Sequence, residues 1–284
     1  MKKISFYYLL VAIAFTSCLK EYSAEQNQDG SDGIIGANCR ISKISYSDSA
    51  GTASIGSIGA TINAADVVTD ITKFDSLTLT LDFNAAPQIF GDTIAIDPDQ
   101  FFITETATKR IKQFHGLIDP AVQGSPEFDV AYAYDAAGYL INKFYTLSSF
   151  PGFPYQKVTY TYNNGNLVKM ITDDLFSGDV IKEADLTYIN TISPKNFWYL
   201  FPDEFTYAEF NQFYNFGKKS TNGVQSLKLR FYDPGNVLVD SAVSTFNNYI
   251  MSRDNYVVSV NMNGSDQSII PAPAGKMRFM YKCK

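Results

Sequence analysis

Residues Tyr132–Leu140 read YAYDAAGYL, and this stretch decides the fold. It begins with two tyrosines one position apart, which lie on one face of a strand because side chains alternate between the two faces. Asp135 and Gly138 then supply a tight turn, since both residue types tolerate its backbone conformations. Leu140 opens a return strand, so the stretch predicts a β-hairpin.

The hairpin pattern recurs three times further along the chain. Residues 160–167 are YTYNNGNL, residues 231–238 are FYDPGNVL, and residues 249–258 are YIMSRDNYVV, in which Asn255 stands in for glycine. A hairpin turn accounts for the whole pattern. Asp135, Asn163 and Asp233 are therefore predicted to shape turns and not to catalyse a reaction.

The rest of the chain alternates in short runs broken by Gly, Asn, Asp and Pro. In SLTLTLDF, residues 76–83, the apolar side chains share one face, which is typical of a half-buried strand. Similar runs occupy residues 157–162, 184–189, 224–232 and 276–281. We expect an all-β fold in which an antiparallel hairpin meander forms a strongly twisted sheet or an incomplete barrel. The alternative is two smaller domains divided near residues 116–126.

One segment, residues 196–216, interrupts the strand pattern with ten aromatic residues. Its spacing predicts one short helix near residues 203–216. Packing in the core explains the aromatic residues. Exposed rings also stack on sugars, so Trp198, Tyr199 and Tyr207 form the candidate binding surface for a glycan or a protein partner.

The N-terminus predicts a membrane anchor. Residues 1–17 resemble a bacterial lipoprotein signal peptide, with two lysines, an apolar run and small residues before Cys18, although Phe15 stands where leucine is usual. We expect lipidation of Cys18. The alternatives are an ordinary secretory signal and an uncleaved anchor. The polar residues 18–37 are predicted to be a tether, followed by a β-rich domain over residues 38–284.

The other two cysteines, Cys39 and Cys283, lie near the ends of this domain. An even pair in an oxidising compartment predicts a disulfide, and the alternative is two separate thiols. Closing so long a loop is worth about 5 kcal/mol in the chain-entropy model. With His115 as the sole histidine, an ordinary zinc site lacks ligands, and we expect no metal.

The sequence points away from most other chemistry. A net charge of −6 disfavours nucleic acid, since binding to phosphates rests on Lys and Arg. No phosphate-binding or dinucleotide motif is present, so no cofactor is expected. His115 is interpreted as a solvated loop residue, and the aspartate-rich segments 97–99, 173–179 and 261–266 as turns that lack calcium-loop spacing. We expect a non-enzyme with a binding or structural role. The alternative is a polysaccharide-acting enzyme with a carboxylate pair.

The hairpins resemble the tyrosine-aspartate (YD) repeats of Rhs-type proteins. The order of parts resembles a Bacteroidota lipoprotein family of unknown function: the lipobox, NCRI at residues 38–41, the hairpins, FGKKS at residues 216–220 and a terminal YKCK. This resemblance implies a β-rich, lipid-anchored protein of the cell envelope and supplies no catalytic residues. With Glu21 near Cys18, it implies the outer membrane, at its periplasmic or cell-surface face.

Overall fold

The computed structural model describes residues 39–75, 80–118, 122, 124–197, 212–264 and 274–283. These residues form seventeen strands. They are β1 (Cys39–Ser47), β2 (Ser54–Ile62), β3 (Val68–Asp75), β4 (Thr80–Ala85), β5 (Gln88–Phe90), β6 (Thr93–Asp97), β7 (Gln100–Thr104), β8 (Ile111–Leu117), β9 (Glu127–Tyr134), β10 (Leu140–Leu147), β11 (Pro154–Asn163), β12 (Asn166–Asp174), β13 (Val180–Ile189), β14 (Gly223–Asp233), β15 (Val237–Met251), β16 (Val257–Gly264) and β17 (Ala274–Cys283).

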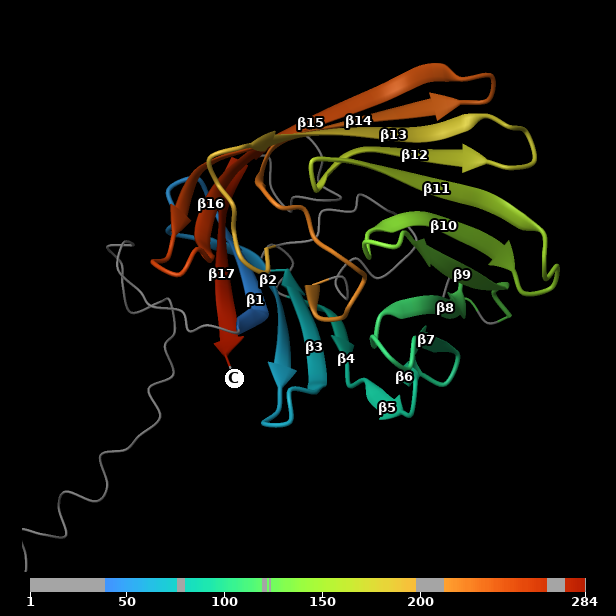
Figure 1. Cartoon of the computed structure of the whole chain (residues 1–284), viewed down its shortest axis with the longest axis horizontal. Helices are drawn as coiled ribbons and strands as arrows, with labels where there is room; N and C mark the ends of the chain where they lie inside the picture. Colours follow the sequence, from blue (N-terminus) through green and yellow to red (C-terminus); the bar gives the residue numbers. More distant parts are fainter. Residues whose placement is uncertain are drawn as a thin grey trace, which may run out of the picture.

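The strands form one antiparallel meander that nearly closes into a ring. Successive strands pair from β1 to β4 and again from β5 to β17. The last strand then returns to the first, with registers from Cys39↔Cys283 to Ser47↔Lys276. Figure 1 shows the resulting barrel shape, with residues 212–222, which precede β14, inside it. The predicted all-β, incomplete-barrel fold is confirmed.

The core lies on one face of the sheet because the strands alternate as their sequences predict. In β9 the buried residues are Phe128, Val130 and Tyr132, each two positions from the next. The connection between β13 and β14 adds Phe216, whose ring lies 5.6 Å from that of Tyr132 and 5.7 Å from that of Phe102. The strand face and the connection therefore share one hydrophobic core.

The two-domain alternative is wrong. β8 pairs with β9 over Gln113↔Ala131 to Leu117↔Glu127, so the sheet continues across the proposed boundary near residues 116–126.

The predicted helix near residues 203–216 lies mostly outside the described residues. Its described end, residues 212–216, is not α-helical. The carbonyl of Asn215 instead accepts a 2.8 Å hydrogen bond from the main-chain N–H of Ile111, and Gly217 follows with a φ of 94°. Pairing with the start of β8 thus replaces the last predicted helical turn. In the described ranges, no helix has the length and apolar character needed to cross a bilayer.

Candidate functional site

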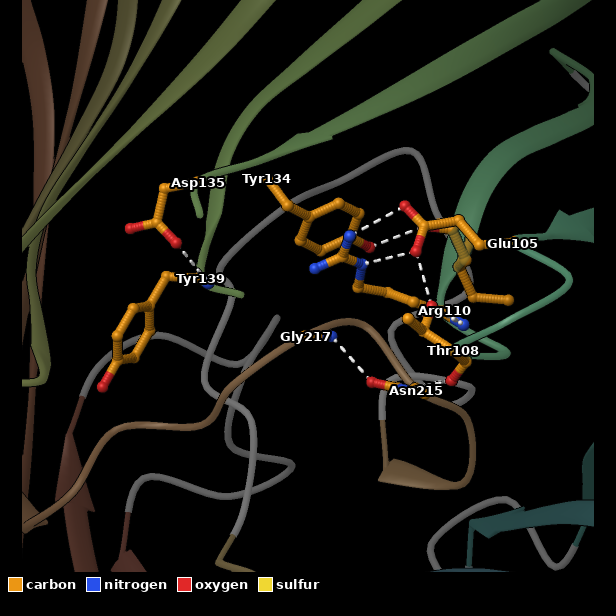
Figure 2. Close-up of polar contacts among 9 residues, drawn as sticks. Glu105, Thr108, Arg110, Tyr134, Asp135, Tyr139, Asn215 and Gly217 are labelled. Carbon is orange, nitrogen blue, oxygen red and sulfur yellow. Dashed lines mark hydrogen bonds and ion pairs between the residues drawn. The ribbon is translucent and has the colours of Figure 1, made fainter. Parts of the chain in front are cut away.

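The hairpin turn at residues 135–139 is held by its own aspartate. The Asp135 carboxylate accepts a 2.8 Å hydrogen bond from the main-chain N–H of Tyr139, and the two backbones pair at 2.9 Å. Gly138 has a φ of 94°, in the left-handed region that favours glycine. Figure 2 shows Asp135 directed at this turn, where it shapes the chain as its sequence pattern predicts.

The other copies of the pattern also form hairpin turns, and each contains a residue with a positive φ. Positive φ values occur at Gly165 (77°), Gly235 (83°) and Asn255 (64°). The expectation that Asn255 stands in for glycine is therefore confirmed. Asparagine tolerates this conformation better than most residues because its short polar side chain bonds locally.

Tyrosines near the strand ends join neighbouring hairpins. In four places a hydroxyl donates to a main-chain carbonyl at the start of the preceding strand, over 2.6 to 2.8 Å: Tyr134 to Ile111, Tyr188 to Leu167, Tyr249 to Val224 and Tyr281 to Val257. We call these four contacts the tyrosine latches. The sequence showed recurring aromatic residues at strand ends, but not that they reach the preceding hairpin.

Burial favours the protonated form of three latch tyrosines. It raises the pKa of Tyr188 to about 12, against the opposing hydrogen bond from Ser220. Burial also raises the pKa of Tyr249 and of Tyr281, with neighbouring tyrosines adding to the shift. A protonated hydroxyl is the form that donates to a carbonyl, so these three latches hold throughout the neutral range.

Residues 215–222, which we call the clasp, run across the turns at the same end of the ring. The Lys218 N–H donates to the Gly138 carbonyl at 2.8 Å, and the Thr221 N–H donates to the Gly165 carbonyl at 3.1 Å. The Ser220 hydroxyl accepts the Leu167 N–H at 3.1 Å. The clasp therefore ties two hairpin turns together, at Gly138 through Lys218 and at Gly165 through Thr221.

Glycine is required where the clasp meets the first turn. A Cβ on Gly217 would lie 2.7 Å from the Gly138 carbonyl oxygen and 2.8 Å from the Tyr134 ring. The φ of Gly217 is also 94°. No other residue fits both the conformation and the space without displacing the turn.

Arg110 is held at this end by an aromatic ring and a carboxylate. Its guanidinium lies 4.0 Å from the centre of the Tyr134 ring and donates two hydrogen bonds to Glu105, at 2.8 and 3.1 Å. The hydrogen bonds from Arg110, and then from Thr108, lower the pKa of Glu105. Figure 2 shows the arginine between the ring and the carboxylate. The two charged groups therefore bond to each other within the fold.

The clasp also carries Lys219, which reaches β1 through Asn196. Its ammonium lies 3.4 Å from the Asn196 carbonyl, and the Asn196 side chain donates to the Cys39 carbonyl at 2.7 Å. Burial and then the charge of Arg40 lower the pKa of Lys219 to about 7. Arg40 itself lies 3.5 Å from Asp66. These contacts attach the clasp to β1.

His115 is not the solvated loop residue that the sequence suggested. It lies within β8, is stacked on Phe101 with ring centres 4.9 Å apart, and has a side chain that is 19% exposed. Its Nδ1 lies 3.0 Å from Asp129, and the Ser148 hydroxyl donates to the other oxygen of that carboxylate at 3.1 Å. In a catalytic triad the hydroxyl would bond to the imidazole, so this geometry does not activate Ser148.

A second polar cluster joins β12, β13 and β14. Arg230 bonds to both Glu183 and Asp185, and Lys169 lies 3.1 Å from Glu183. Burial tends to raise the pKa of Glu183, but hydrogen bonds from Tyr232 and Lys169 and the nearby positive charges outweigh it and lower the pKa. A general acid for glycoside hydrolysis needs the opposite shift, so Glu183 is not placed to act as one.

The remaining predicted site residues fall into two groups. Cys39 and Cys283 form a disulfide with an S–S distance of 2.02 Å, at the first register of the β1–β17 pair. Cys18, Trp198, Tyr199 and Tyr207 lie outside the described residues. Within the described part of the chain, no group of three or more His, Cys, Asp or Glu side chains is placed to hold a metal ion.

Solved structures resemble this fold, among them two porin-like proteins of Bacteroides. A porin-like protein from Bacteroides uniformis has a TM-score of 0.59 and 14% identity, over 85% of this chain and 96% of that one. A porin-like protein from Bacteroides vulgatus has a TM-score of 0.52 and 12% identity, over 86% of this chain and 99% of that one. At these identities the similarity concerns the fold alone. No protein-family model and no curated protein matches the chain.

Proposed function

We propose that this chain is a non-catalytic protein of the bacterial cell envelope, anchored in the outer membrane by a lipid on Cys18, with a binding or structural role. The observation that carries the proposal is that the polar side chains of each cluster bond to one another. Those built around Arg110, His115 and Arg230 each bond within themselves and brace neighbouring strands. A scaffold needs this arrangement, whereas an enzyme needs groups directed at a substrate.

The pKa values support the same reading. Four described carboxyl groups have a shifted pKa, and in each it is lowered: Asp48, Asp92, Glu105 and Glu183. Carboxylate-based hydrolysis of a polysaccharide requires one carboxyl whose pKa is raised. The likeness to porin-like proteins of Bacteroides supports the envelope location.

The anchor is tested by replacing Cys18 with alanine. We expect the wild-type chain to incorporate a labelled fatty acid and to fractionate with membranes. The Cys18→Ala chain should lose both properties and keep its far-ultraviolet circular dichroism, because every described strand begins after residue 38. A Cys18→Ala chain that still fractionates with membranes would falsify the lipid anchor.

The binding role is tested with a glycan array and a Trp198→Ala variant. Binding that disappears in the variant supports a glycan surface at Trp198, Tyr199 and Tyr207. If no glycan is bound, the role that remains is contact with a protein partner or a structural one. Release of new reducing ends from a polysaccharide, abolished by a carboxylate variant, would contradict the non-catalytic proposal.

A further inference from the structure

Three consecutive hairpin turns at one end of the ring expose large apolar side chains. The residues and their exposed fractions are Phe150 (63%) and Phe153 (72%) between β10 and β11, Leu175 (40%) and Phe176 (78%) between β12 and β13, and Val237 (59%) and Leu238 (54%) after the β14–β15 turn. We call these six residues the apolar rim. Ile118 (45%) and Val122 (54%), between β8 and β9, extend it. Such a grouping of exposed apolar residues indicates an interaction surface.

The rim is one surface because its turns are tied side by side. The main-chain N–H of Leu175 donates to the Tyr155 carbonyl at 2.9 Å, joining the second turn to the first hairpin. The Asn236 side chain accepts the Val180 N–H at 2.7 Å, joining the third turn to the second. Figure 1 shows the β10–β11, β12–β13 and β14–β15 turns on the same side of the molecule, at the right of the view.

The rim lies at the end of the ring opposite the clasp and the disulfide. β10 begins at the turn that the clasp binds and ends at the turn that carries Phe150 and Phe153. The antiparallel order places the next two rim turns at the same end. The chain therefore enters the ring at Cys39, one strand length away from the rim.

We propose that the apolar rim docks on the surface of a zwitterionic lipid bilayer. Each of the three turns presents two apolar side chains at its tip. Three separate tips match a planar, deformable surface better than a single pocket. At a membrane interface, the apolar side chains of all three turns can insert between the lipid headgroups at once.

Charge specifies the type of bilayer. Five aspartates flank the second and third rim turns, namely Asp173, Asp174, Asp179, Asp233 and Asp240, against two lysines beside the rim turns, Lys157 and Lys182. Anionic headgroups would repel the aspartates, whereas neutral headgroups would not. The proposal therefore commits to zwitterionic lipid.

The length of the N-terminal segment allows the rim and the proposed lipid to meet the same membrane. Twenty residues separate Cys18 from Cys39, which reach about 70 Å when extended. The ten residues of β11 span about 33 Å. The segment is thus about twice the height of the sheet. This step rests on the proposed anchor, while docking by the rim does not require it.

The test uses the chain from residue 19 onward, which lacks the lipidated cysteine and retains every described residue. It is mixed with vesicles of phosphatidylcholine, and the bound fraction is measured by co-flotation. We expect binding that changes little with salt, because apolar contacts are not screened. Vesicles of equal parts phosphatidylcholine and phosphatidylglycerol should bind less protein. Stronger binding to the anionic vesicles would overturn the assignment to zwitterionic lipid.

The rim variant combines Phe153→Ser, Phe176→Ser and Leu238→Ser, one change in each turn. We expect its partition coefficient to fall on the order of a hundredfold, because each change removes an inserted apolar side chain. The control combines Ile89→Ser and Phe90→Ser in β5, whose side chains are 46% and 63% exposed. The turn after Phe90 contains Asp92, which forms a 2.8 Å ion pair with Lys109 at the clasp end. The control residues therefore lie away from the rim. The control should bind like the parent chain.

Two further results would overturn the proposal. The first is no flotation of the parent chain with phosphatidylcholine. The second is a dimer in sedimentation analysis that the rim variant dissociates, which would assign the rim to self-association. Neither result bears on fatty-acid labelling of Cys18. Failure of the rim and failure of the anchor are therefore distinguishable.

Discussion

The Tyr188 hydroxyl donates a 2.7 Å hydrogen bond to the carbonyl of Leu167, across the boundary between two hairpins. Leu167 is the second residue of β12 and Tyr188 is the last but one of β13, so the bond fixes the register between the two strands. The same relation joins three other pairs of strands. The register of the ring is thus specified by side chains as well as by its backbone ladders.

Replacing Tyr188 with phenylalanine is expected to lower the free energy of unfolding by about 1–2 kcal/mol. The change leaves the partly buried Leu167 carbonyl and the Ser220 hydroxyl without this partner. Urea denaturation measures the effect. Tyr155→Phe is the matched control, since the Tyr155 hydroxyl bonds to no other described residue, and it should cost only a few tenths of a kcal/mol. Equal losses in both variants would show that the latch contributes nothing.

Alkaline pH should weaken the fold through the latches. The pKa of Tyr188 is raised to about 12 in the folded chain, against about 10 in an unfolded chain. A raised folded-state pKa gives stability that is complete below about pH 10 and is lost as the pH rises toward 12. Denaturation midpoints measured across this window should fall with pH, and less steeply for Tyr188→Phe. A variant with the parent slope would exclude Tyr188 as a cause.

Gly217→Ala is expected to destabilise the protein by about 2–4 kcal/mol. The new Cβ would meet the Gly138 carbonyl at 2.7 Å, in addition to the cost of the positive φ. Gly152→Ala is the control, because its φ is 87° and its Cβ would meet nothing within 4 Å. That variant should cost about 1 kcal/mol. The difference between their thermal midpoints isolates the steric contact, and no difference would mean that the clasp moves aside.

Removing the bridge by replacing Cys39 and Cys283 with alanine should cost about 2–5 kcal/mol. The two cysteines are 244 positions apart, so the bridge restrains nearly the whole described chain when it unfolds. Thiol labelling of the unfolded chain checks the bond directly. We expect no free Cys39 or Cys283 without a reductant, and labelling of both after reduction would serve as the positive control.

Much of the fold follows from local sequence. The alternation in KVTYTY and the Asn-Gly turn after it predict β11, a tight turn and β12, and all three are present. Periodicity specifies one strand at a time, however. It does not say that β17 returns to β1, because that pairing depends on contacts more than two hundred residues apart.

The polar network was less predictable than the strands. FGKKS was recognised as a motif, but the contact of Lys218 with Gly138 uses backbone atoms, which leave no mark in a pattern of side chains. Thr221, which contacts Gly165, lies just outside that motif. Asn215 was assigned to a helix by aromatic spacing, and a bridge to Arg110 prevails there. The rim residues Phe150, Phe153 and Phe176 were missed because an exposed phenylalanine in a turn looks the same in sequence as a buried one.

The pairing of β1 with β17 also constrains the order of folding. The ladder joins the first described residue to the last, so it cannot form until the ten residues of β17 have been synthesised. Until then the edge of β1 presents unpaired main-chain donors and acceptors, which any other extended segment can bind. The β1–β17 pairing therefore cannot precede the synthesis of β17, whatever the order in which the hairpins form. In a chain truncated before β17 this edge of β1 stays unpaired. Such incomplete chains are expected to aggregate and to be cleaved by proteases.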